Sequence, residues 1–300
     1  MKFTTLFNKT SLVIASIATV TLTSNIALAH NHSAETSKVS FETTELSPNL
    51  YMLSGVGGFT GGNIALSVGD DGVIMIDNGL SKFYDLLKEE IKATTDRPID
   101  YLINTHLHQD HTANNLGFGK DGAQIISHDN VREAFVKEKN DNGSLPVITF
   151  ADQMTLHINS DTAKIIHAEN AHTNGDSIIH FQNANVIHTG DLLFNGRFPF
   201  IDGNNGGTLA GVLAGLNTVL SLSNDETKII PGHGPLANKA DIIKTIAFLE
   251  DARDLIADLV KQGKTDEEIH AANPLSKYES YSWGFINTEK MINQVISNVR

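Results

Sequence analysis

The feature that most restricts how this 300-residue chain folds is residues 105–115, with the sequence THLHQDHTANN. They follow directly on residues 99–104 (IDYLIN), an apolar run that predicts a buried strand. Three imidazoles and one carboxylate within six positions suit neither a hydrophobic core nor a regular helix. The segment is therefore either a solvated loop that is rich in histidine by chance, or a set of side chains that bind a common ligand.

A metal ion would account for the spacing of these side chains. His106 and His108 are two residues apart at the end of the expected strand, so both point to the same side. Asp110 and His111 follow where the chain turns. Imidazole and carboxylate are ligands that zinc accepts at roughly 2.0–2.2 Å, and two pairs of ligands favour two adjacent ions. Because the chain contains no cysteine, any metal site must be built from histidine, aspartate and glutamate.

Strand and helix signals alternate along most of the chain. We expect strands at residues 49–53, 63–68, 73–76, 99–104, 123–127, 164–168, 177–181, 186–189 and 228–230. We expect four helices. One begins after Ser81, which can cap it, two span residues 208–222 and 241–260, and a short one begins at a capping box in residues 265–268. Residues 202–207 are predicted to be a loop. This interleaving indicates the α/β or α+β class, and no linker divides residues 46–300, which we predict to be one domain.

Residues 1–29 have the pattern of a secretory signal peptide. Lys2 and Lys9 precede an apolar run at residues 11–22, and the small-x-small sequence ALA follows at residues 27–29. The apolar run is too short to span a bilayer, although a permanent N-terminal anchor is the competing interpretation. Residues 30–45 are polar and are predicted to be flexible. The expected location is periplasmic or secreted.

The charge of the chain restricts its partners. The net charge is −13, and it becomes −15 without residues 1–29, because these contain two lysines and no acid. Such a surface repels nucleic acid and anionic lipid. We therefore expect a small-molecule substrate, no nucleic acid, and no membrane contact after signal cleavage. The sequence does not indicate the oligomeric state.

Three later motifs complete the pattern that begins at His106. His172 lies in AHTNGDS, Asp191 in HTGDLLF and His233 in PGHG, each after an apolar strand. The ordered series HxHxDH, His, Gly-Asp and Gly-His-Gly resembles the metallo-β-lactamase superfamily, and Asp77 in IMIDNG matches an upstream aspartate of that pattern. The resemblance covers nearly all of the expected mature chain. It implies a four-layer αββα sandwich with metals at one edge, between the two sheets.

The resemblance also implies a role for each motif residue. One zinc would be held by His106, His108 and His172, and a second by Asp110, His111 and His233. Asp191 would bridge the ions, and Asp77 would orient the cluster from behind. The expected cofactor is two Zn²⁺ ions, and other divalent metals also fit this ligand set. Zinc lowers the pKa of bound water to about 7, so a metal-bridging hydroxide would attack a substrate carbonyl while Asp110 orients or shuttles the proton.

Three hypotheses about the function stay open. The favoured one is an exported dizinc metallohydrolase that acts on a small ester, lactone, thioester or amide. Asp191 favours it, because a bridging aspartate is typical of glyoxalase II and lactonases and is usually absent from the all-histidine zinc β-lactamases. Hydrolysis of the β-lactam ring is the alternative, since an exported protein meets such compounds. The third hypothesis is a non-catalytic zinc-binding or redox-relay factor, although no ligand is missing.

Two candidate substrate contacts lie near the ligand motifs. Phe59 is the apolar tip of residues 54–62 (SGVGGFTGG), which resemble the hairpin that overhangs the site in this superfamily. These glycines are equally compatible with a simple tight turn. Arg197 in NGRFPF is placed to meet a substrate carboxylate, with a structural ion pair as the alternative.

The other aromatic and imidazole side chains are predicted to be mainly structural. Packing is favoured over covering the cleft for Tyr278, Tyr281 and Trp283. Structural or exposed positions are favoured for His128, His157, His167, His180 and His188. Of these, His188 is also a candidate for orienting Asp191, which follows three residues later.

Overall fold

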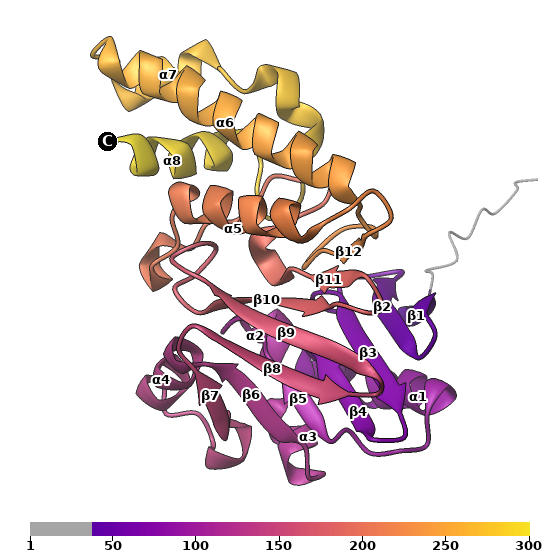
Figure 1. The fold of residues 1–300 in the computed structure, drawn as a ribbon. Coiled ribbons are helices and arrows are strands. Elements are labelled where there is room, and N and C mark those ends of the chain that lie inside the picture. Colours follow the sequence, from indigo (N-terminus) through magenta and orange to yellow (C-terminus); the bar gives the residue numbers. More distant parts are fainter. Residues whose placement is uncertain (1–37) are drawn as a thin grey trace, which may run out of the picture. The chain divides into compact units, whose positions relative to one another are not determined.

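The computed structural model describes residues 38–300, so the predicted signal peptide at residues 1–29 lies outside the described residues. Within residues 38–300 two β-sheets pack face to face, and helices cover the outer face of each sheet (Figure 1). The α/β class and the four-layer αββα arrangement expected from the sequence are confirmed.

The first sheet contains seven strands in sequence order, β1 to β7. Their bounds are β1 Ser40–Ser47, β2 Leu50–Val56, β3 Ile64–Gly69, β4 Gly72–Ile76, β5 Tyr101–Ile103, β6 Gln124–His128 and β7 Ile148–Phe150. The strands from β1 to β4 pair antiparallel, whereas β4, β5, β6 and β7 pair parallel.

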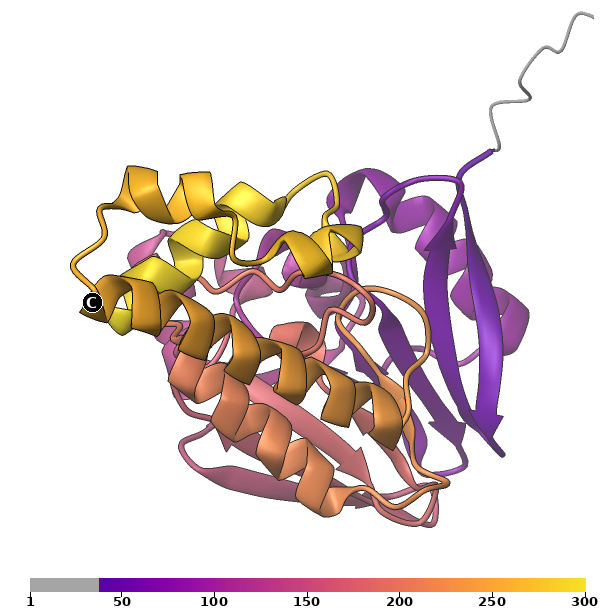
Figure 2. The same ribbon diagram turned by 90° about the horizontal axis from the view of Figure 1, so that it is seen from above.

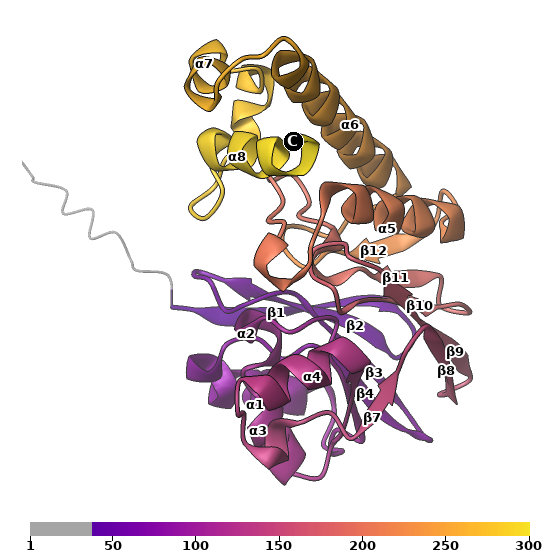
Figure 3. The same cartoon turned by 90° about the vertical axis from the view of Figure 1, so that its left-hand side faces the viewer.

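The second sheet has the order β12–β11–β10–β9–β8. Its strands are β8 Gln153–Ile158, β9 Asp161–Ala168, β10 Asp176–Phe181, β11 Val186–His188 and β12 Lys228–Ile230. Only β11 and β12 pair parallel in this sheet. The helices are α1 Tyr84–Thr94, α2 Gln109–Thr112, α3 Asn115–Lys120, α4 Asp129–Lys137, α5 Leu209–Leu222, α6 Lys239–Lys261, α7 Asp266–Ala272 and α8 Thr288–Val299. Figure 3 shows α1, α3 and α4 on one side of the sheets and α5, α6 and α8 on the other.

Strand β4 shows how the sequence builds these layers. It is buried along its whole length, because both faces of its sheet are covered. Ile74 and Ile76 point into the core between the sheets, where Ile179 of β10 also lies. Met75 points the other way and packs in a core with Leu87 of α1.

Helices α5 to α8 form the other outer layer. Leu216, Leu249 and Val295, from α5, α6 and α8, share one core with Ile187 of the second sheet. Figure 2 shows α5 and α6 running side by side. The predicted capping box opens α7, because the Thr265 and Glu268 side chains each bond the other's backbone N–H. Within residues 38–300, no helix is both long enough and apolar enough to cross a membrane.

All the motif residues follow strands at one edge of the sandwich. Because β4 and β5 are parallel, their carboxyl ends lie at the same edge of the first sheet. Asp77 and residues 104–111, which follow these strands, therefore lie at that edge together. Because β11 and β12 are parallel, Asp191 and His233 leave the second sheet together. The turn between β9 and β10 carries His172, and it lies beside the end of β11. The topology therefore brings five separate segments to one place.

Two local predictions are wrong. Residues 40–45 are expected to be flexible but belong to β1, which pairs antiparallel with β2 and buries Phe41 and Leu46. The polar residues between them conceal the strand in the sequence. Ser81 begins a 3₁₀ turn without a capping hydrogen bond, and α1 starts only at Tyr84. Strands β7 and β8 and helices α3, α4 and α8 have no counterpart among the predicted elements.

Candidate metal centre

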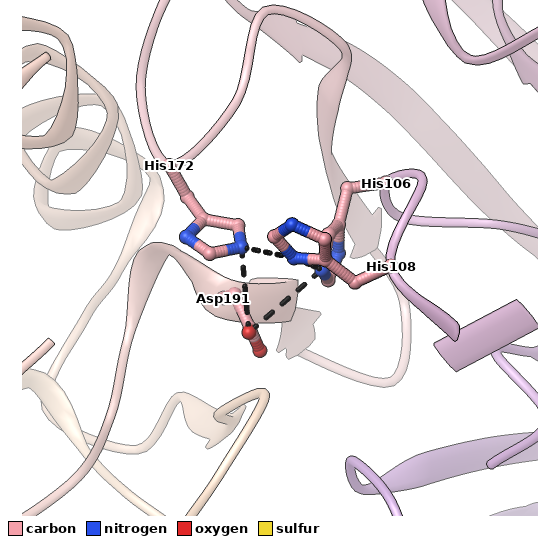
Figure 4. A group of neighbouring side chains, drawn as sticks. All are labelled: His106, His108, His172 and Asp191. Atoms are coloured by element: carbon pink, nitrogen blue, oxygen red, sulfur yellow. Dashed lines mark hydrogen bonds and ion pairs between the residues drawn. The ribbon is translucent and has the colours of Figure 1, made fainter. Parts of the chain in front are cut away.

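Three imidazoles and one carboxylate form a first group of candidate metal ligands, which we call the first ligand group (Figure 4). Nδ1 of His108 lies 3.1 Å from Nε2 of His106 and 2.8 Å from Nε2 of His172. Oδ2 of Asp191 lies 3.7 Å from Nε2 of His106 and 3.5 Å from Nε2 of His172. The four ligand atoms lie within 4.8 Å of one another, which is compact enough to surround one ion.

The outer ring nitrogens of these histidines show where their protons lie. Each faces an oxygen that accepts a hydrogen bond: Thr105 Oγ1 for His106 (2.9 Å), Asp202 Oδ2 for His108 (2.9 Å) and the Phe200 carbonyl for His172 (2.7 Å). In a neutral imidazole the inner nitrogen then carries a lone pair. Three lone pairs that converge repel one another unless a cation lies between them. The first group therefore fits a metal ion.

Two residues of α2 and one from the loop after β12 form the second ligand group. Nε2 of His233 lies 3.2 Å from Oδ2 of Asp110 and 3.4 Å from Nε2 of His111. Asp191 reaches this group with its other oxygen: Oδ1 lies 3.1 Å from Nε2 of His111 and 3.4 Å from Nε2 of His233. Asp191 thus contacts both groups, one with each carboxylate oxygen.

Oδ1 of Asp191 is an orphaned atom in a buried position. It forms no hydrogen bond of good geometry with any part of residues 38–300, although the nitrogen of His111 is near. A buried carboxylate oxygen without a partner is costly. A second cation between His111, His233 and this oxygen would satisfy it, so the second group also fits a metal ion.

Asp77 lies behind both groups and is fully buried. Its carboxylate accepts hydrogen bonds from the backbone N–H of Thr105 (2.8 Å), the Thr105 hydroxyl (2.8 Å) and Nδ1 of His111 (2.7 Å). Its contact with His111 keeps the ring proton on Nδ1, so that Nε2 faces the second ligand group. Because the Thr105 hydroxyl donates to Asp77, it accepts from Nδ1 of His106 and keeps the proton of that ring on Nδ1 too. Asp77 has a φ of +59°, an unfavourable backbone conformation that this network holds in place.

Two glycines allow the backbone to approach the ligands closely. A Cβ on Gly62 would lie 2.1 Å from Cε1 of His111, and a Cβ on Gly232 would lie 2.0 Å from Oδ1 of Asp191. The Asn63 side chain donates to the carbonyls of Pro231 and Gly234, which ties the hairpin to the PGHG loop. The glycine-rich hairpin is thus more than a tight turn, since Gly62 gives the His111 ring its space.

The electrostatics of the two groups differ. Burial lowers the pKa of His172 to about 4 and holds that of His106 well below its usual value. Burial also opposes the charged form of His233, but the carboxylates of Asp191 and Asp110 outweigh it and raise this pKa to about 8. His172 and His106 are therefore neutral imidazoles, whereas His233 of the second group forms ion pairs with Asp110 and Asp191.

A cavity of about 870 Å³ opens above the ligands, and both candidate substrate contacts line it. Phe59 is 50% exposed, and its ring stacks on His233 with centroids 5.6 Å apart. The Arg197 guanidinium lies 5.4 Å from the centre of the Trp283 ring and forms no ion pair within residues 38–300. The alternative of a structural ion pair for Arg197 is therefore not observed.

The C-terminal aromatic residues divide between two roles. Tyr278 and Tyr281 pack against Phe248 of α6, as the favoured prediction has it. Trp283 lines the cavity instead, beside Phe285, which the sequence analysis did not single out. His188 accepts a hydrogen bond from the N–H of Gly190 (3.1 Å) and faces the Asn63 carbonyl (3.1 Å), so it orders the turn before Asp191.

Sequence reasoning missed the polar residues that support the ligand loop. Asp202, in the segment predicted only to be a loop, bonds His108. Asn115, the last residue of THLHQDHTANN, accepts hydrogen bonds from the amides of Asn78 (2.7 Å) and Asn104 (3.0 Å) and donates to Asn104 (2.8 Å). This buried network joins the ends of β4 and β5 to α3. The run of asparagines was the available signal for it.

Comparison with known proteins gives one family and several distant relatives. Residues 57–233, more than half of the chain, match the metallo-β-lactamase superfamily. The chain is 31% identical over 152 residues to a probable hydroxyacylglutathione hydrolase of Schizosaccharomyces pombe, over 49% of this chain and 53% of that protein. It is 28% identical over 135 residues to 2,4-dinitroanisole O-demethylase subunit alpha of a Nocardioides strain, over 43% of this chain and 40% of that protein.

Solved structures share the fold at lower identity. A metallo-β-lactamase from Pontibacter korlensis matches with a TM-score of 0.61 and 16% identity, over 71% of this chain and 100% of that one. The chain spans between 40% and 63% of the length of the curated relatives it matches. The protein belongs to the metallo-β-lactamase superfamily, whose members are mostly hydrolases and usually bind metals.

Proposed function

We propose that this protein is a dizinc hydrolase of a small ester, lactone, thioester or amide. The observation that carries the proposal is Asp191, which offers one carboxylate oxygen to each ligand group. In this proposal His106, His108 and His172 hold one ion, and Asp110, His111 and His233 hold the other. Two bound zinc ions would supply an activated water and polarise the substrate carbonyl.

Asp110 is the residue we assign to proton transfer. Its carboxylate lines the cavity and is 23% exposed, whereas Asp191 is 5% exposed. Burial tends to raise the pKa of Asp110, but His111 and His233 outweigh burial and lower that pKa. Asp110 is therefore ionised at neutral pH. It is placed to take a proton on the cavity side and return it to the leaving group.

The cavity walls determine which substrates reach these groups. Phe59 and Phe194 both stack on His233, so bulk water is excluded from that side. Arg197 is a cation in the wall of the same cavity. We assign it to binding a carboxylate or another anionic group of the substrate.

Beta-lactam hydrolysis is the second candidate function. The match in fold to solved metallo-β-lactamases favours it. The bridging position of Asp191 and the similarity to a probable hydroxyacylglutathione hydrolase favour the ester, lactone or thioester class. Another relative is named 2,4-dinitroanisole O-demethylase subunit alpha, so similarity in the catalytic core does not determine the substrate by itself.

Metal analysis together with a hydrolysis panel tests the proposal. We expect two zinc equivalents per chain and turnover of at least one ester, lactone, thioester or β-lactam. Asp110→Ala and His172→Ala should lose turnover, whereas His157→Ala, at an exposed position on β8, should keep it. Turnover that survives in both ligand variants contradicts the proposal. A protein that holds zinc but hydrolyses nothing in the panel supports a non-catalytic zinc-binding or redox-relay factor.

The location is a separate proposal, which the pattern of residues 1–29 supports. We propose that the protein is exported and that cleavage leaves His30 at the N-terminus. N-terminal sequencing of the protein from periplasmic or culture fractions tests this. Recovery of residues 1–29 in the membrane fraction would instead indicate a permanent anchor.

A further inference from the structure

Aromatic side chains from the C-terminal part of the chain form one wall of the cavity above the ligands. Trp283 and Phe285 lie between the 3₁₀ helix Ser276–Tyr281 and α8, and both line the cavity. The region that matches the superfamily ends at residue 233. These two side chains therefore come from a segment outside the region that matches the superfamily.

Trp283 and Phe285 complete a continuous arc of aromatic rings. Phe194 stacks on His233 (5.1 Å between centroids), and Phe200 stacks on His108 (5.9 Å). Between them, Trp283 lies 5.9 Å from Phe194 and 5.8 Å from Phe285, and Phe285 lies 5.2 Å from Phe200. We call these four rings, Phe194, Trp283, Phe285 and Phe200, the aromatic arc. It runs from the second ligand group to the first.

The segment that carries the arc is anchored by hydrogen bonds to the loop after Asp191. The indole N–H of Trp283 donates to the Phe198 carbonyl (2.9 Å), and the Phe198 N–H donates to the Tyr281 carbonyl (2.8 Å). Gln294 of α8 accepts from the Ile201 N–H (2.6 Å). The Arg197 guanidinium lies over the Trp283 ring, 5.4 Å from its centre. The wall is therefore positioned by the fold and does not depend on a bound substrate.

The arc leaves apolar surface open at the cavity. Phe285 is 48% exposed, and Phe59, which lines the same cavity, is 50% exposed. Large apolar side chains that remain exposed around a cavity are typical of ligand sites, because a ligand removes them from water. Flat aromatic groups fit such a wall best, since stacked and edge-on ring contacts add to the gain from burial.

We infer that residues 281–286 are the specificity element of this site, and that they select carbonyl substrates carrying a large flat apolar group, above all an aromatic ring. The inference rests on the proposed function for the reaction, but its claim concerns binding. The hydrolysed bond lies over the two ligand groups, and the aromatic group of the substrate lies against Trp283 and Phe285. Small substrates without such a group bind weakly.

A binding experiment tests this claim without any turnover. Trp283 is the only tryptophan of the chain, so its emission reports on the arc directly. The zinc-loaded protein is titrated with 4-nitrobenzyl alcohol, a neutral aromatic quencher with no bond to hydrolyse. We expect saturable quenching, weakened roughly tenfold in Phe285→Ala and less in Phe285→Leu. Ile243→Ala, at an exposed position of α6, should bind as the wild type does. Linear quenching of equal slope in every variant overturns the inference.

A matched pair of lactones tests specificity in turnover. Dihydrocoumarin and δ-valerolactone share a six-membered lactone ring, and only the former carries a fused benzene ring. Phe285→Ala should lower the ratio of their kcat/KM values roughly tenfold, mainly through the KM for dihydrocoumarin, while Ile243→Ala keeps the ratio. If both lactones are hydrolysed and Phe285→Ala leaves the ratio of their kcat/KM values unchanged, the inference is wrong while the proposed function still holds. Saturable binding without hydrolysis of any substrate contradicts the proposed function alone.

Discussion

Oδ2 of Asp202 lies 2.9 Å from Nε2 of His108, and this contact holds the most exposed residue of the first ligand group. The carboxylate accepts a hydrogen bond from the Nε2–H group of His108. The lone pair of this ring is therefore on Nδ1, which faces the other residues of the first ligand group. Asp202 also accepts hydrogen bonds from the backbone and side chain of Asn205, which orient it.

Replacement of Asp202 should weaken metal binding without removing a ligand. Asp202→Ala is expected to lower zinc affinity roughly 10- to 100-fold, because the His108 ring loses its orientation and its basicity. Asp202→Asn should lose less, since its carbonyl oxygen still accepts from Nε2. Competition with a chromophoric chelator measures this, and Asp225→Ala, at a carboxylate that is 95% exposed, is the control. Equal affinity in wild type and Asp202→Ala would contradict the assigned role.

Replacement of Asp191 should weaken the binding of two ions, whereas replacement of His233 should weaken the binding of one. His233 belongs to one ligand group, so His233→Ala is expected to retain about one zinc equivalent. Asp191 reaches both groups, so Asp191→Ala should weaken the binding of both ions. Elemental analysis after dialysis against a weak chelator distinguishes these outcomes. Retention of two equivalents by Asp191→Ala would show that the carboxylate does not bridge.

The grouping of the candidate ligands could be predicted from the sequence, because the ordered motifs resemble those of the superfamily and each motif follows an apolar strand. His106, Asp191 and His233 each follow an apolar strand, and strands that end at one edge bring their following residues together. The alternation of strands and helices indicated only the α/β or α+β class, and the four-layer arrangement followed from the resemblance to the superfamily.

The supporting residues could not be predicted in this way. The contact of Asp202 with His108 joins residues 94 positions apart, and only the path of an irregular loop creates it. The place of Trp283 over the cavity depends on the hydrogen bond from its indole N–H to the Phe198 carbonyl and on the backbone bond between Phe198 and Tyr281, and neither contact leaves a pattern in the sequence. The sequence does not indicate strand β1, because only Phe41 and Leu46 are buried in it and its other side chains are polar and partly or fully exposed.

Gly232 should tolerate no side chain. A Cβ there would lie 2.0 Å from Oδ1 of Asp191 and 2.7 Å from the carbonyl carbon of Gly190, and that backbone is fixed by the N–H of Gly232. We expect Gly232→Ala to lose zinc and to lower the free energy of unfolding by about 1–3 kcal/mol. Gly203→Ala is the matched control, because a Cβ at Gly203 meets nothing within 4 Å. Chemical denaturation and metal analysis test both variants, and normal zinc content in Gly232→Ala would contradict the predicted clash.

His128 should make the stability of the fold depend on pH. Its Nδ1 accepts a hydrogen bond from the N–H of Asn130 at the start of α4 (3.2 Å), and its Nε2–H donates a hydrogen bond to the Ala151 carbonyl (2.6 Å). The neutral ring therefore satisfies both contacts. Burial and the neighbouring His167, whose ring stacks at 3.7 Å, lower the pKa of His128, while the carboxylates of Asp129 and Asp152 oppose the shift.

Because the pKa of His128 is lower in the folded than in the unfolded chain, its contribution to stability is complete above the unfolded value of about 6.5 and is lost as the pH falls below it. His128→Asn keeps a side chain that caps α4 but cannot titrate. In chelator-treated protein, its Tm should therefore fall less than that of the wild type between about pH 7 and about pH 5. His157→Asn, at an exposed position, should follow the wild type. An equally steep fall in His128→Asn would show that the pH dependence arises at other histidines.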